Sequence, residues 1–570
     1  MPAGPAVEPE AKESNMMQMT GAQLMVRLLE RQGVRTVAGI PGGAILPFYD
    51  ALSGSEHIHH VLARHEQGAG FIAQGMARVS GVPQVCIASS GPGATNLVTA
   101  IADACLDSIP MVVITGQVPQ AMIGTDAFQE VDIYGITVPI TKHNFLVRSA
   151  QELLEVIPDA FRIAMSGRPG PVLIDVPKDV QNQLVAVAEF PAPAVADPAP
   201  QLDLAAVELA AKMINEAEQP VLYLGGGVVA SGAAPLAVQL AEQAGLPTTM
   251  TLMALGAMPM DHPLSIGMLG MHGARYTNFV LEEADVLVCV GARFDDRAIG
   301  RAAQFCPNAK IVHIDIDRSE LHKIKNAHVA IHANVKCALE ALLPRVQATL
   351  RKRWLSHVDS LKTRFPMQFP GQDDPRTHYG LIQAVAAALD DRAIVATDVG
   401  QHQMWVAQAY PFRRPRQWLT SGGLGTMGFG LPSALGAALA EPGRTVVCFT
   451  GDGSFKMNIQ ELATLAEEGL NVKIVLMNNN ALGLVYQQQT LFYGQRLFAS
   501  KYRTEPDFVK IAEGFGVPAV DLDLADNPRA ALAEALHRPG PCLIHATIDR
   551  EQFVYPMVPP GAANTEMIGG

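Results

Sequence analysis

The sequence predicts an α/β protein of three domains, each built on a parallel sheet flanked by helices. Apolar, strand-like runs alternate with amphipathic helical stretches along nearly the whole chain, which is typical of parallel sheets covered by helices. The 570 residues exceed what one hydrophobic core organises. An Ala/Pro-rich stretch at 186–201 and a charged, then Pro/Gly-rich stretch at 350–377 interrupt the alternation, and both are typical of linkers.

The two linkers divide the chain into a first domain at 19–185, a middle domain at 202–349 and a third domain at 378–570. Residues 1–18 contain more acids than bases and no apolar core. They match neither a secretory signal nor an Arg-rich transit peptide, so we expect a flexible tail there.

The composition excludes several classes of protein. A formal charge of −13 argues against nonspecific binding to nucleic acids, which needs a basic surface. Every apolar run is interrupted before the ~18–20 residues that span a membrane. The seven scattered cysteines form no C-x-x-C pair, so we expect reduced core residues of a cytoplasmic protein. His57, His59 and His60 could bind a metal, but strand alternation sends His59 and His60 to opposite faces.

The first and third domains are expected to be related folds. Each pairs a glycine-rich turn that opens a small-residue helix, at 89–104 and 420–440, with a buried strand ending in Thr-Gly, at 111–116 and 446–451. The middle domain has strands of its own, "PVLYLGGG", "DVLVCVGARFDD" and "KIVHIDIDR". These predict a separate, nucleotide-binding-like sheet.

A β-α-β unit is predicted around Asp452. The strand "RTVVCFT" is apolar throughout, as in strands buried on both faces. Residues 456–468 fit a helix that ends at Gly469, and "VKIVLM" is the next strand. Because a right-handed crossover puts both strand ends at one edge of a parallel sheet, Asp452 and Asn479 should converge there.

Ligands bind open α/β sheets at that edge. A carboxylate, an amide oxygen and a backbone carbonyl suit a hard divalent cation that keeps phosphate oxygens as its other ligands. The glycine-rich turn and the following helix start supply amides for the phosphate. The alternative is that Asp452 is a turn or capping residue and the three asparagines form a polar loop.

The G-D-G sequence followed at this spacing by N-N is similar to the signature of thiamin diphosphate enzymes. The resemblance implies that Asp452, Asn479 and the backbone oxygen of Ala481 hold Mg²⁺ against the cofactor's diphosphate. A third amide, Asn480, makes the register less obvious, although Asn479 keeps the family spacing.

Glu66 stands where a strand gives way to a small-residue helix, in "RHEQGAGFIAQGMAR". From the residues alone it is either a first-turn acid, favoured by the helix dipole or paired with Arg64, or a catalytic group. In thiamin diphosphate enzymes a glutamate at this position bonds a ring nitrogen of the aminopyrimidine and promotes its imino form. The resemblance therefore implies that Glu66 is catalytic.

Further motifs resemble the catalytic subunits of the acetohydroxyacid synthase (acetolactate synthase) family, isozyme I type, along nearly the whole chain. They are "RHEQGAGFIAQGMAR", "SGPGATN", "IGTDAFQE", "SGRPGPVLIDVPKDV", "GMLGMHG", "GARFDDR", "DVGQHQMW" and "GGLGTMGFGLP". The resemblance implies a transferase that decarboxylates pyruvate on thiamin diphosphate and joins the hydroxyethyl unit to pyruvate or 2-ketobutyrate. This is the first common step of branched-chain amino-acid biosynthesis.

The same resemblance implies a set of binding residues. Those expected at the diphosphate are Gln401, His402, Gly451, Gly453 and Ser454. Met427 is expected to support the bent cofactor, the alternative being core packing. Phe128 and a catalytic Gln129 should line the pocket. Arg293 should meet the carboxylate of the second 2-keto acid; the alternative is an ion pair with Asp295 or Asp296.

The family places FAD in the middle domain, bound without net redox chemistry. The residues implied are Gly226, Gly227, Thr251, Leu252, Gly273, Arg275, Asp295, Arg297, Asp315 and Ile316. From the residues alone, Gly226 and Gly227 can form a simple tight turn, because they are not part of a G-x-G-x-x-G fingerprint. Asp315 follows a strand, where an acid can accept bonds from nucleotide hydroxyl groups.

Gln488 replaces a tryptophan that many family members carry and that favours 2-ketobutyrate, so we expect only a weak preference between acceptors. The family also implies a homodimer, with Glu66 of one subunit facing Asp452 of another, a small regulatory subunit, and a C-terminal segment, 555–570, near the active-site entrance. A pyruvate oxidase, a 2-keto-acid decarboxylase and a noncatalytic subunit are the alternatives. The motifs "GARFDDR" and "IGTDAFQE" argue against the oxidase, and the expected region lacks the adjacent-histidine motif of the decarboxylases. Intact Glu66, Asp452 and Asn479 argue against the noncatalytic subunit.

Overall fold

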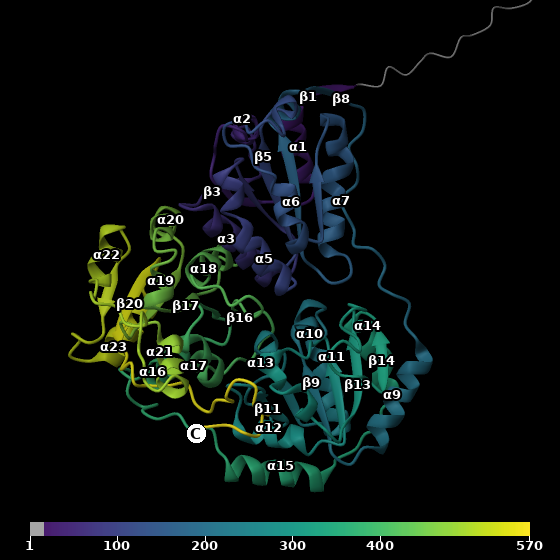
Figure 1. The fold of residues 1–570 in the computed structure, drawn as a ribbon, viewed down its shortest axis with the longest axis vertical. Coiled ribbons are helices and arrows are strands. Elements are labelled where there is room, and N and C mark those ends of the chain that lie inside the picture. Colours follow the sequence, from purple (N-terminus) through teal and green to yellow (C-terminus); the bar gives the residue numbers. More distant parts are fainter. Residues whose placement is uncertain (1–15, 570) are drawn as a thin grey trace, which may run out of the picture.

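The computed structural model describes residues 16–569 and contains three six-stranded parallel sheets flanked by helices (Figure 1). The prediction of a three-domain α/β fold is therefore confirmed. Most of the predicted tail, residues 1–15, lies outside the described residues.

The first domain has the sheet order β3-β2-β4-β5-β7-β6. Its strands are β2 (Thr36–Gly39), β3 (His59–Leu62), β4 (Gln84–Ala88), β5 (Met111–Gln117), β6 (His143–Leu146) and β7 (Pro171–Pro177). Its helices are α1 (Gly21–Arg31), α2 (Leu46–Leu52), α3 (Glu66–Ser80), α4 (Pro92–Thr95), α5 (Val98–Leu106), α6 (Ile133–Thr137), α7 (Leu153–Met165) and α8 (Lys178–Asn182).

The third domain has the order β16-β15-β17-β18-β20-β19. Its strands are β15 (Ile394–Thr397), β16 (Trp418–Leu419), β17 (Val446–Gly451), β18 (Val472–Asn478), β19 (Ala519–Asp521) and β20 (Cys542–Thr547). Its helices are α16 (His378–Ala388), α17 (Gln401–Ala409), α18 (Gly430–Ala440), α19 (Asp452–Phe455), α20 (Glu461–Glu468), α21 (Gly483–Phe492), α22 (Phe508–Gly514) and α23 (Pro528–His537). Counted within each domain, both sheets have the order 2-1-3-4-6-5, so the predicted relationship between the first and third domains holds for their topology.

The middle domain has a different order, β11-β10-β9-β12-β13-β14. Its strands are β9 (Pro220–Leu224), β10 (Thr248–Met250), β11 (Ser265–Met268), β12 (Val286–Val290), β13 (Lys310–Asp315) and β14 (Val329–His332). Its helices are α9 (Leu204–Glu216), α10 (Gly226–Ala230), α11 (Ala234–Ala244), α12 (Arg275–Glu282), α13 (Asp296–Ile299) and α14 (Val335–Leu342). Within the domain the order is 3-2-1-4-5-6, that of dinucleotide-binding sheets.

The structure moves three of the predicted domain limits. β1 (Met17–Thr20) pairs antiparallel with β8 (Leu184–Val187), so the first domain begins inside the predicted tail 1–18 and ends inside the predicted linker 186–201. In the predicted linker 350–377, α15 (Lys352–Arg364) buries Trp354, Val358 and Leu361 against the middle domain. The apolar face of α15 thus attaches this helix to the core of the middle domain. The many charged residues of the segment made that attachment hard to predict from the sequence.

The predicted β-α-β unit is present, but its helix starts later than expected. Both strands lie side by side in parallel register, and Gly469 ends α20 in a left-handed conformation. The predicted helix over 456–468 is correct only from Glu461 onward. Asn458 turns inward and donates to the carbonyl of Gly428, 30 residues away, at 2.6 Å, and this long-range bond takes the place of the first predicted helical turn.

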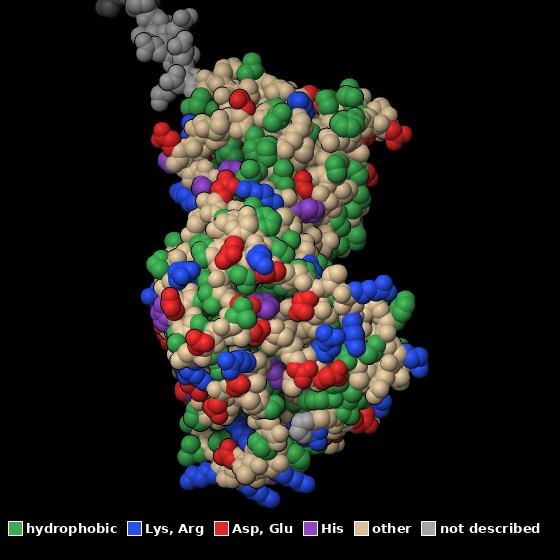
Figure 2. All heavy atoms as spheres, turned by 90° about the vertical axis from the view of Figure 1, so that its left-hand side faces the viewer, with side chains coloured by type: hydrophobic (Ala, Val, Ile, Leu, Met, Phe, Trp, Pro, Cys, Tyr) green, Lys and Arg blue, Asp and Glu red, His purple; other side chains and the backbone are tan. Residues whose placement is uncertain are grey.

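The histidine cluster is split as strand alternation predicts. His59 Nε2 lies 2.8 Å from Glu468 Oε2, whereas His60 Nε2 lies 3.1 Å from the hydroxyl of Tyr49. The seven cysteines are all free thiols, five of them buried, with Cys105 half-buried and Cys337 exposed. Within residues 16–569, no helix combines the length and the apolar run needed to cross a bilayer. Acidic and basic side chains are interspersed over the face drawn in Figure 2.

The first and third domains meet where α3 packs across α18 (Figure 1). Gly75 lies against the carbonyl of Ser433, and Gly436 lies against the carbonyl of Ile72. A β-carbon at either glycine would overlap backbone atoms of the other helix. The two helices can approach this closely only because both positions lack a side chain.

We predict that Gly75→Ala lowers the apparent melting temperature by several degrees, because overpacking a rigid contact costs ~1–3 kcal/mol. Gly443→Ala is the matched control, since a β-carbon added there would have no atom within 4 Å. Differential scanning calorimetry at one scan rate compares the two variants. Equal melting temperatures for both would contradict the packing argument.

Candidate active site

The carboxyl ends of β17 and β18 bring Asp452 and Asn479 together. Gly451 and Met477 are partners in the parallel register, so both strands end at the same edge. The backbone N–H of Asn479 donates to Asp452 Oδ1 at 3.4 Å. The convergence predicted from the β-α-β crossover is therefore present.

The turn after β18 directs several oxygens toward this edge. Asn480 has a φ of 50°, in the left-handed region, and it reverses the chain. The N–H of Ala481 donates to Asn479 Oδ1 at 3.1 Å, and Asn479 Nδ2 donates to Gln401 Oε1 at 3.1 Å. Asp452 is 1 % exposed, and burial raises the pKa of its carboxyl. The carboxylate that follows β17, together with the amide and backbone carbonyl oxygens of the turn after β18, forms a donor set that fits Mg²⁺.

The crevice between β15 and β17 lies beside that donor set. The strand order of the third domain reverses between these two strands, which is where open sheets of this kind bind phosphate ligands. His402 is buried there with no partner for Nε2, and burial lowers its pKa to about 3. A β-carbon at Gly451 would lie 2.9 Å from His402 Nδ1. An unpaired nitrogen beside a glycine turn fits a diphosphate group.

Two of the other predicted diphosphate residues, Gln401 and Ser454, already make internal hydrogen bonds. Gln401 Nε2 donates to Gln487 Oε1 at 3.1 Å and to the carbonyl of Gln552 at 3.0 Å. The hydroxyl of Ser454 donates to the carbonyl of Val399 at 2.8 Å. Both side chains thus connect neighbouring segments around the switch point.

Met427 lies on the loop between β16 and α18. A β-carbon added at Gly453 would lie 3.6 Å from the methyl group of Met427. Asp398, at the end of β15, accepts from the N–H of Gly428 at 2.7 Å and from the hydroxyl of Thr450 at 3.0 Å. Burial raises the pKa of Asp398 to about 6. Met427 therefore faces the same glycine turn as Asp452.

Glu66 is the first residue of α3, and three residues separate it from the end of β3. Asn96 Nδ2 donates to Glu66 Oε2 at 2.9 Å, and Gly93 lies beside Oε1. These contacts stay within the first domain, whereas those of Asp452 stay within the third. The ion pair of Glu66 with Arg64, which was the alternative to a catalytic role, is not formed. Arg64 contacts Glu467 instead.

The middle domain presents its own glycine turn at the switch point between β9 and β12. Gly225 and Gly227 lie against Gly291 and Ala292, so backbone meets backbone there. Asp315, at the end of β13, is buried and has a pKa raised to about 6 by burial. Thr251 Oγ1 is buried with no partner. An orphaned hydroxyl, an acid and a glycine turn at a switch point fit a dinucleotide such as FAD.

Comparison with known proteins gives matches along the whole chain. Three family descriptions fit in order: thiamine pyrophosphate enzyme, N-terminal TPP binding domain (19–136), central domain (207–342) and C-terminal TPP binding domain (398–546). Thiamine pyrophosphate is another name for thiamin diphosphate.

Curated relatives carry one activity in their names. "Acetolactate synthase isozyme 1 large subunit" of Escherichia coli (strain K12) is 64 % identical over 98 % of this chain and 99 % of that protein. This chain belongs to the acetolactate synthase large-subunit family. Isozyme 2 of the same organism is 47 % identical over 96 % of this chain and 99 % of its own, and "Acetolactate synthase 1, chloroplastic" of Zea mays is 46 % identical over 96 % and 88 %. The prediction of a thiamine-pyrophosphate-dependent transferase is confirmed.

The other FAD residues predicted from the acetolactate synthase resemblance belong to segments of the middle domain near the switch point between β9 and β12. Leu252 opens a short 3₁₀ helix after β10, and Asp295 caps α13 by accepting from the N–H groups of Arg297 and Ala298, both at 3.1 Å. Gly273, just before α12, packs against backbone atoms of Met268 and Leu269. Ile316 directly follows Asp315.

Arg275 meets the C-terminal segment. It donates to the carbonyls of Met567 and Gly569, at 3.2 and 2.7 Å, and its Nε is buried without a partner.

The substrate residues predicted from the acetolactate synthase resemblance are spread over the three domains. Arg293 is half-buried after β12, and in the described part of the chain Asp296 pairs with Arg297, at 3.7 Å, rather than with Arg293. Phe128 is 88 % exposed, and Gln129 packs against Gly91 in a left-handed conformation. Gln488 is exposed on α21.

The sequence did not single out three residues that organise the site. Gln487, next to Gln488, is fully buried and bonds Gln401 and the backbone of Val554. Asn96, in the motif "SGPGATN", orients Glu66, and Asp398, in "DVGQHQMW", fixes the loop that bears Met427. A polar residue inside an otherwise apolar helix face is the signal for Gln487, while the other two lie inside motifs already recognised.

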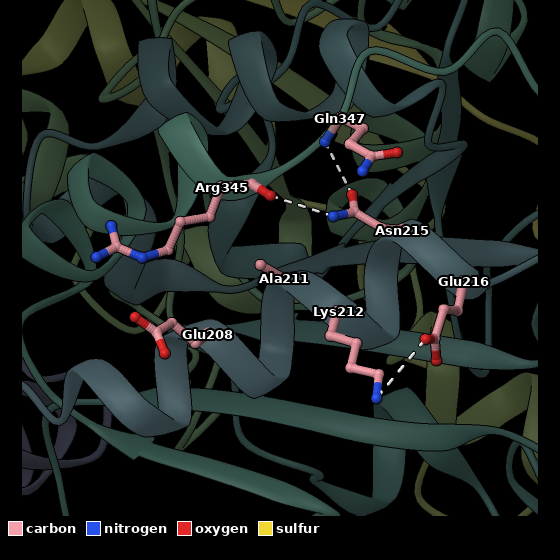
Figure 3. A pocket seen from close by; sticks show the side chains of 7 residues that line it. All are labelled: Glu208, Ala211, Lys212, Asn215, Glu216, Arg345 and Gln347. Atoms are coloured by element: carbon pink, nitrogen blue, oxygen red, sulfur yellow. Dashed lines mark hydrogen bonds and ion pairs between the residues drawn. The ribbon is translucent and has the colours of Figure 1, made fainter.

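A surface hollow of about 360 Å³ lies elsewhere, on α9 (Figure 3). Asn215 spans the carbonyl of Arg345 and the N–H of Gln347, and Lys212 pairs with Glu216. Because Asn215 and Lys212 are both engaged in these internal contacts, we assign the hollow no role.

We predict that Asn479→Ala weakens thiamine pyrophosphate binding at least about 100-fold, more than the loss of an outer-shell partner usually costs. Asn480→Gly should bind normally, because glycine adopts the left-handed conformation without strain. Calorimetric titration of the coenzyme at saturating Mg²⁺ measures both. A comparable loss in the two variants would contradict the assignment of Asn479 as the ligand.

Proposed function

We propose that this chain decarboxylates pyruvate and transfers the two-carbon unit to a second 2-keto acid. Acetolactate forms from two pyruvates, and acetohydroxybutyrate forms when 2-ketobutyrate is the acceptor. This is the first common step of branched-chain amino-acid biosynthesis. The observation that carries the proposal is the convergence of Asp452 and Asn479 at the switch-point edge of the third domain, in a chain 64 % identical to a named acetolactate synthase.

The residues at that edge hold the cofactor. Asp452, Asn479 and the backbone oxygen of Ala481 would hold Mg²⁺ beside the diphosphate. Gln401, His402, Gly451, Gly453 and Ser454 contact the diphosphate. Bound thiamine pyrophosphate supplies the carbon nucleophile and the electron sink. The neutral His402 can donate one hydrogen bond without adding charge.

Glu66 and Met427 act on the other end of the cofactor. Glu66, oriented by Asn96, would bond a ring nitrogen of the aminopyrimidine and hold the proton exchanged there. Met427 supports the bent cofactor from beside Gly453. The buried surroundings keep water from the reacting carbon, which favours a step in which charge disappears.

Two subunits complete each site. Glu66 makes its contacts in the first domain and Asp452 in the third, and neither contacts the other within the chain. The exposed Phe128 and Gln129 face outward on the first domain, as residues would that line a site on another subunit. We therefore include a homodimer in the proposal. On the family resemblance, the proposal also includes a small regulatory subunit and a cytoplasmic location.

The middle domain binds FAD without net redox chemistry. Its support is the 3-2-1-4-5-6 strand order, the Gly225–Gly227 turn, the orphaned hydroxyl of Thr251 and the acid Asp315. Arg293 binds the carboxylate of the acceptor. Arg297, which is largely exposed, is a second guanidinium on the same turn.

Product analysis tests the overall proposal. We predict that the holoenzyme converts pyruvate to acetolactate, and that omitting thiamine pyrophosphate or Mg²⁺ abolishes this product. Pyruvate-dependent bleaching of the flavin or peroxide formation would identify an oxidase instead. Release of acetaldehyde alone would identify a simple decarboxylase.

A second prediction concerns the acceptor. Gln488→Trp should raise the preference for 2-ketobutyrate over pyruvate by about 10-fold or more, because an apolar contact that reads one methylene is worth ~1–3 kcal/mol. Competition between the two acceptors, with both products quantified, measures the ratio. An unchanged product ratio would show that Gln488 does not determine acceptor specificity. Strong selection of 2-ketobutyrate by the unmodified protein would lead to the same conclusion.

A further inference from the structure

The loop that carries Met427 is held by the first domain, although it belongs to the third. It runs from Thr420 to Phe429 between β16 and α18. Asp107, at the end of α5, accepts from the N–H groups of Gly422 and Gly423 at 3.1 and 2.7 Å. The same carboxylate therefore fixes two consecutive peptide groups of a glycine-rich, conformationally free segment.

Asp103, one turn earlier on α5, holds the next part of the loop. Its Oδ2 accepts from the hydroxyls of Ser421 and Thr426, the latter at 2.7 Å. The hydroxyl of Ser421 in turn accepts from the N–H of Thr426 at 2.9 Å. Asp103 thus fixes the residue immediately before Met427.

Arg78 on α3 closes this network. Its guanidinium donates to Asp103 at 3.2 Å, to Asp107 at 2.8 Å and to the carbonyl of Thr420 at 3.0 Å. It also lies over the ring of Phe429 at 4.9 Å. The side chains of the three charged residues are at most 5 % exposed. Two buried carboxylates around one guanidinium are costly to assemble, and removing the guanidinium would leave both carboxylates without their cation.

The residue after Met427 is fixed from the opposite side. Gly428 donates to Asp398, and its carbonyl accepts from Asn458. Met427 is therefore bracketed between Thr426, held by the first domain, and Gly428, held by the third. Because both neighbours are fixed, the direction of the Met427 side chain toward Gly453 is set by two domains together.

We infer that Asp103 and Asp107 are positioning residues for the thiamine pyrophosphate site, acting across the domain boundary through the loop that carries Met427. The inference rests on the proposed function. It also links the two sites of the proposed dimer, because α3 begins with Glu66, which serves one site, and bears Arg78, which shapes the loop of the other.

A purely structural role is the alternative, in which the network only joins the two domains. Both roles predict a lower melting temperature when a carboxylate is removed. Only positioning predicts a defect in the bound coenzyme, so the readouts must report on the coenzyme itself.

The test compares Asp107→Asn, Asp107→Ala and Asp103→Asn with Asp175→Asn. Asp175 is the matched control, since it is equally buried in the first domain and accepts from Thr115 and Gln117 at 2.8 and 3.0 Å, far along the sequence from this loop. Full-length protein with Mg²⁺ and FAD is titrated with thiamine pyrophosphate by calorimetry. The exchange of the coenzyme's C2 proton with deuterium is then followed by quenched-flow NMR.

We expect about 10-fold weaker coenzyme binding and about 10-fold slower C2 exchange in Asp107→Ala, with a smaller loss in Asp107→Asn, which keeps one acceptor oxygen. Asp175→Asn should change neither. Wild-type affinity and exchange in both Asp107→Ala and Asp103→Asn, with only the melting temperature lowered, would overturn the inference.

If these variants do not fold, Ser421→Ala provides the same test, because it removes one hydroxyl and no charge. It should slow C2 exchange, and unchanged exchange would count against positioning. Asn479→Ala separates this outcome from a failure of the proposed function. If Asn479→Ala also binds the coenzyme normally, the site itself is misassigned.

Discussion

The pairing of β17 with β18 decides where chemistry can occur in this protein. Parallel register ends both strands at one edge, and only there can a carboxylate after one strand meet an amide after the next. The left-handed Asn480 then turns the chain so that Ala481 follows within reach. Every other feature of the site, from the His402 crevice to the Met427 loop, is arranged around this edge.

Close backbone contacts make the arrangement of the domains possible. Gly75 and Gly436 let α3 and α18 touch, and the glycine turn after β9 lets backbone approach backbone at the switch point of the middle sheet. These contacts contribute packing rather than chemistry. The contact between α3 and α18 nevertheless fixes the distance between the domain that bears Glu66 and the domain that bears Asp452 in each subunit, and a side chain at Gly75 or Gly436 would change it.

Much of the fold and part of the site could be predicted from the sequence. Continuous apolar strands and the crossover rule were sufficient to bring Asp452 and Asn479 together, because both follow from local pattern and topology. The start of α20 could not be predicted, since the inward turn of Asn458 depends on Gly428, 30 residues away. Gln487 was missed for the same reason: its partners, Gln401 and Val554, come from elements that only the tertiary fold assembles. The linker helix α15 showed its charge in the sequence, but its buried face became evident only against the middle domain.

The final residues of the chain fasten the third domain to the second. Val558 donates to the carbonyl of Met271, Arg301 donates to the carbonyl of Ala562, and Arg275 holds the carbonyls of Met567 and Gly569. Earlier in the same segment, the carbonyl of Gln552 accepts a hydrogen bond from Gln401. The middle and third domains therefore cannot separate unless the C-terminal segment first detaches from the middle domain. That detachment would also loosen the surroundings of Gln401 in the coenzyme site.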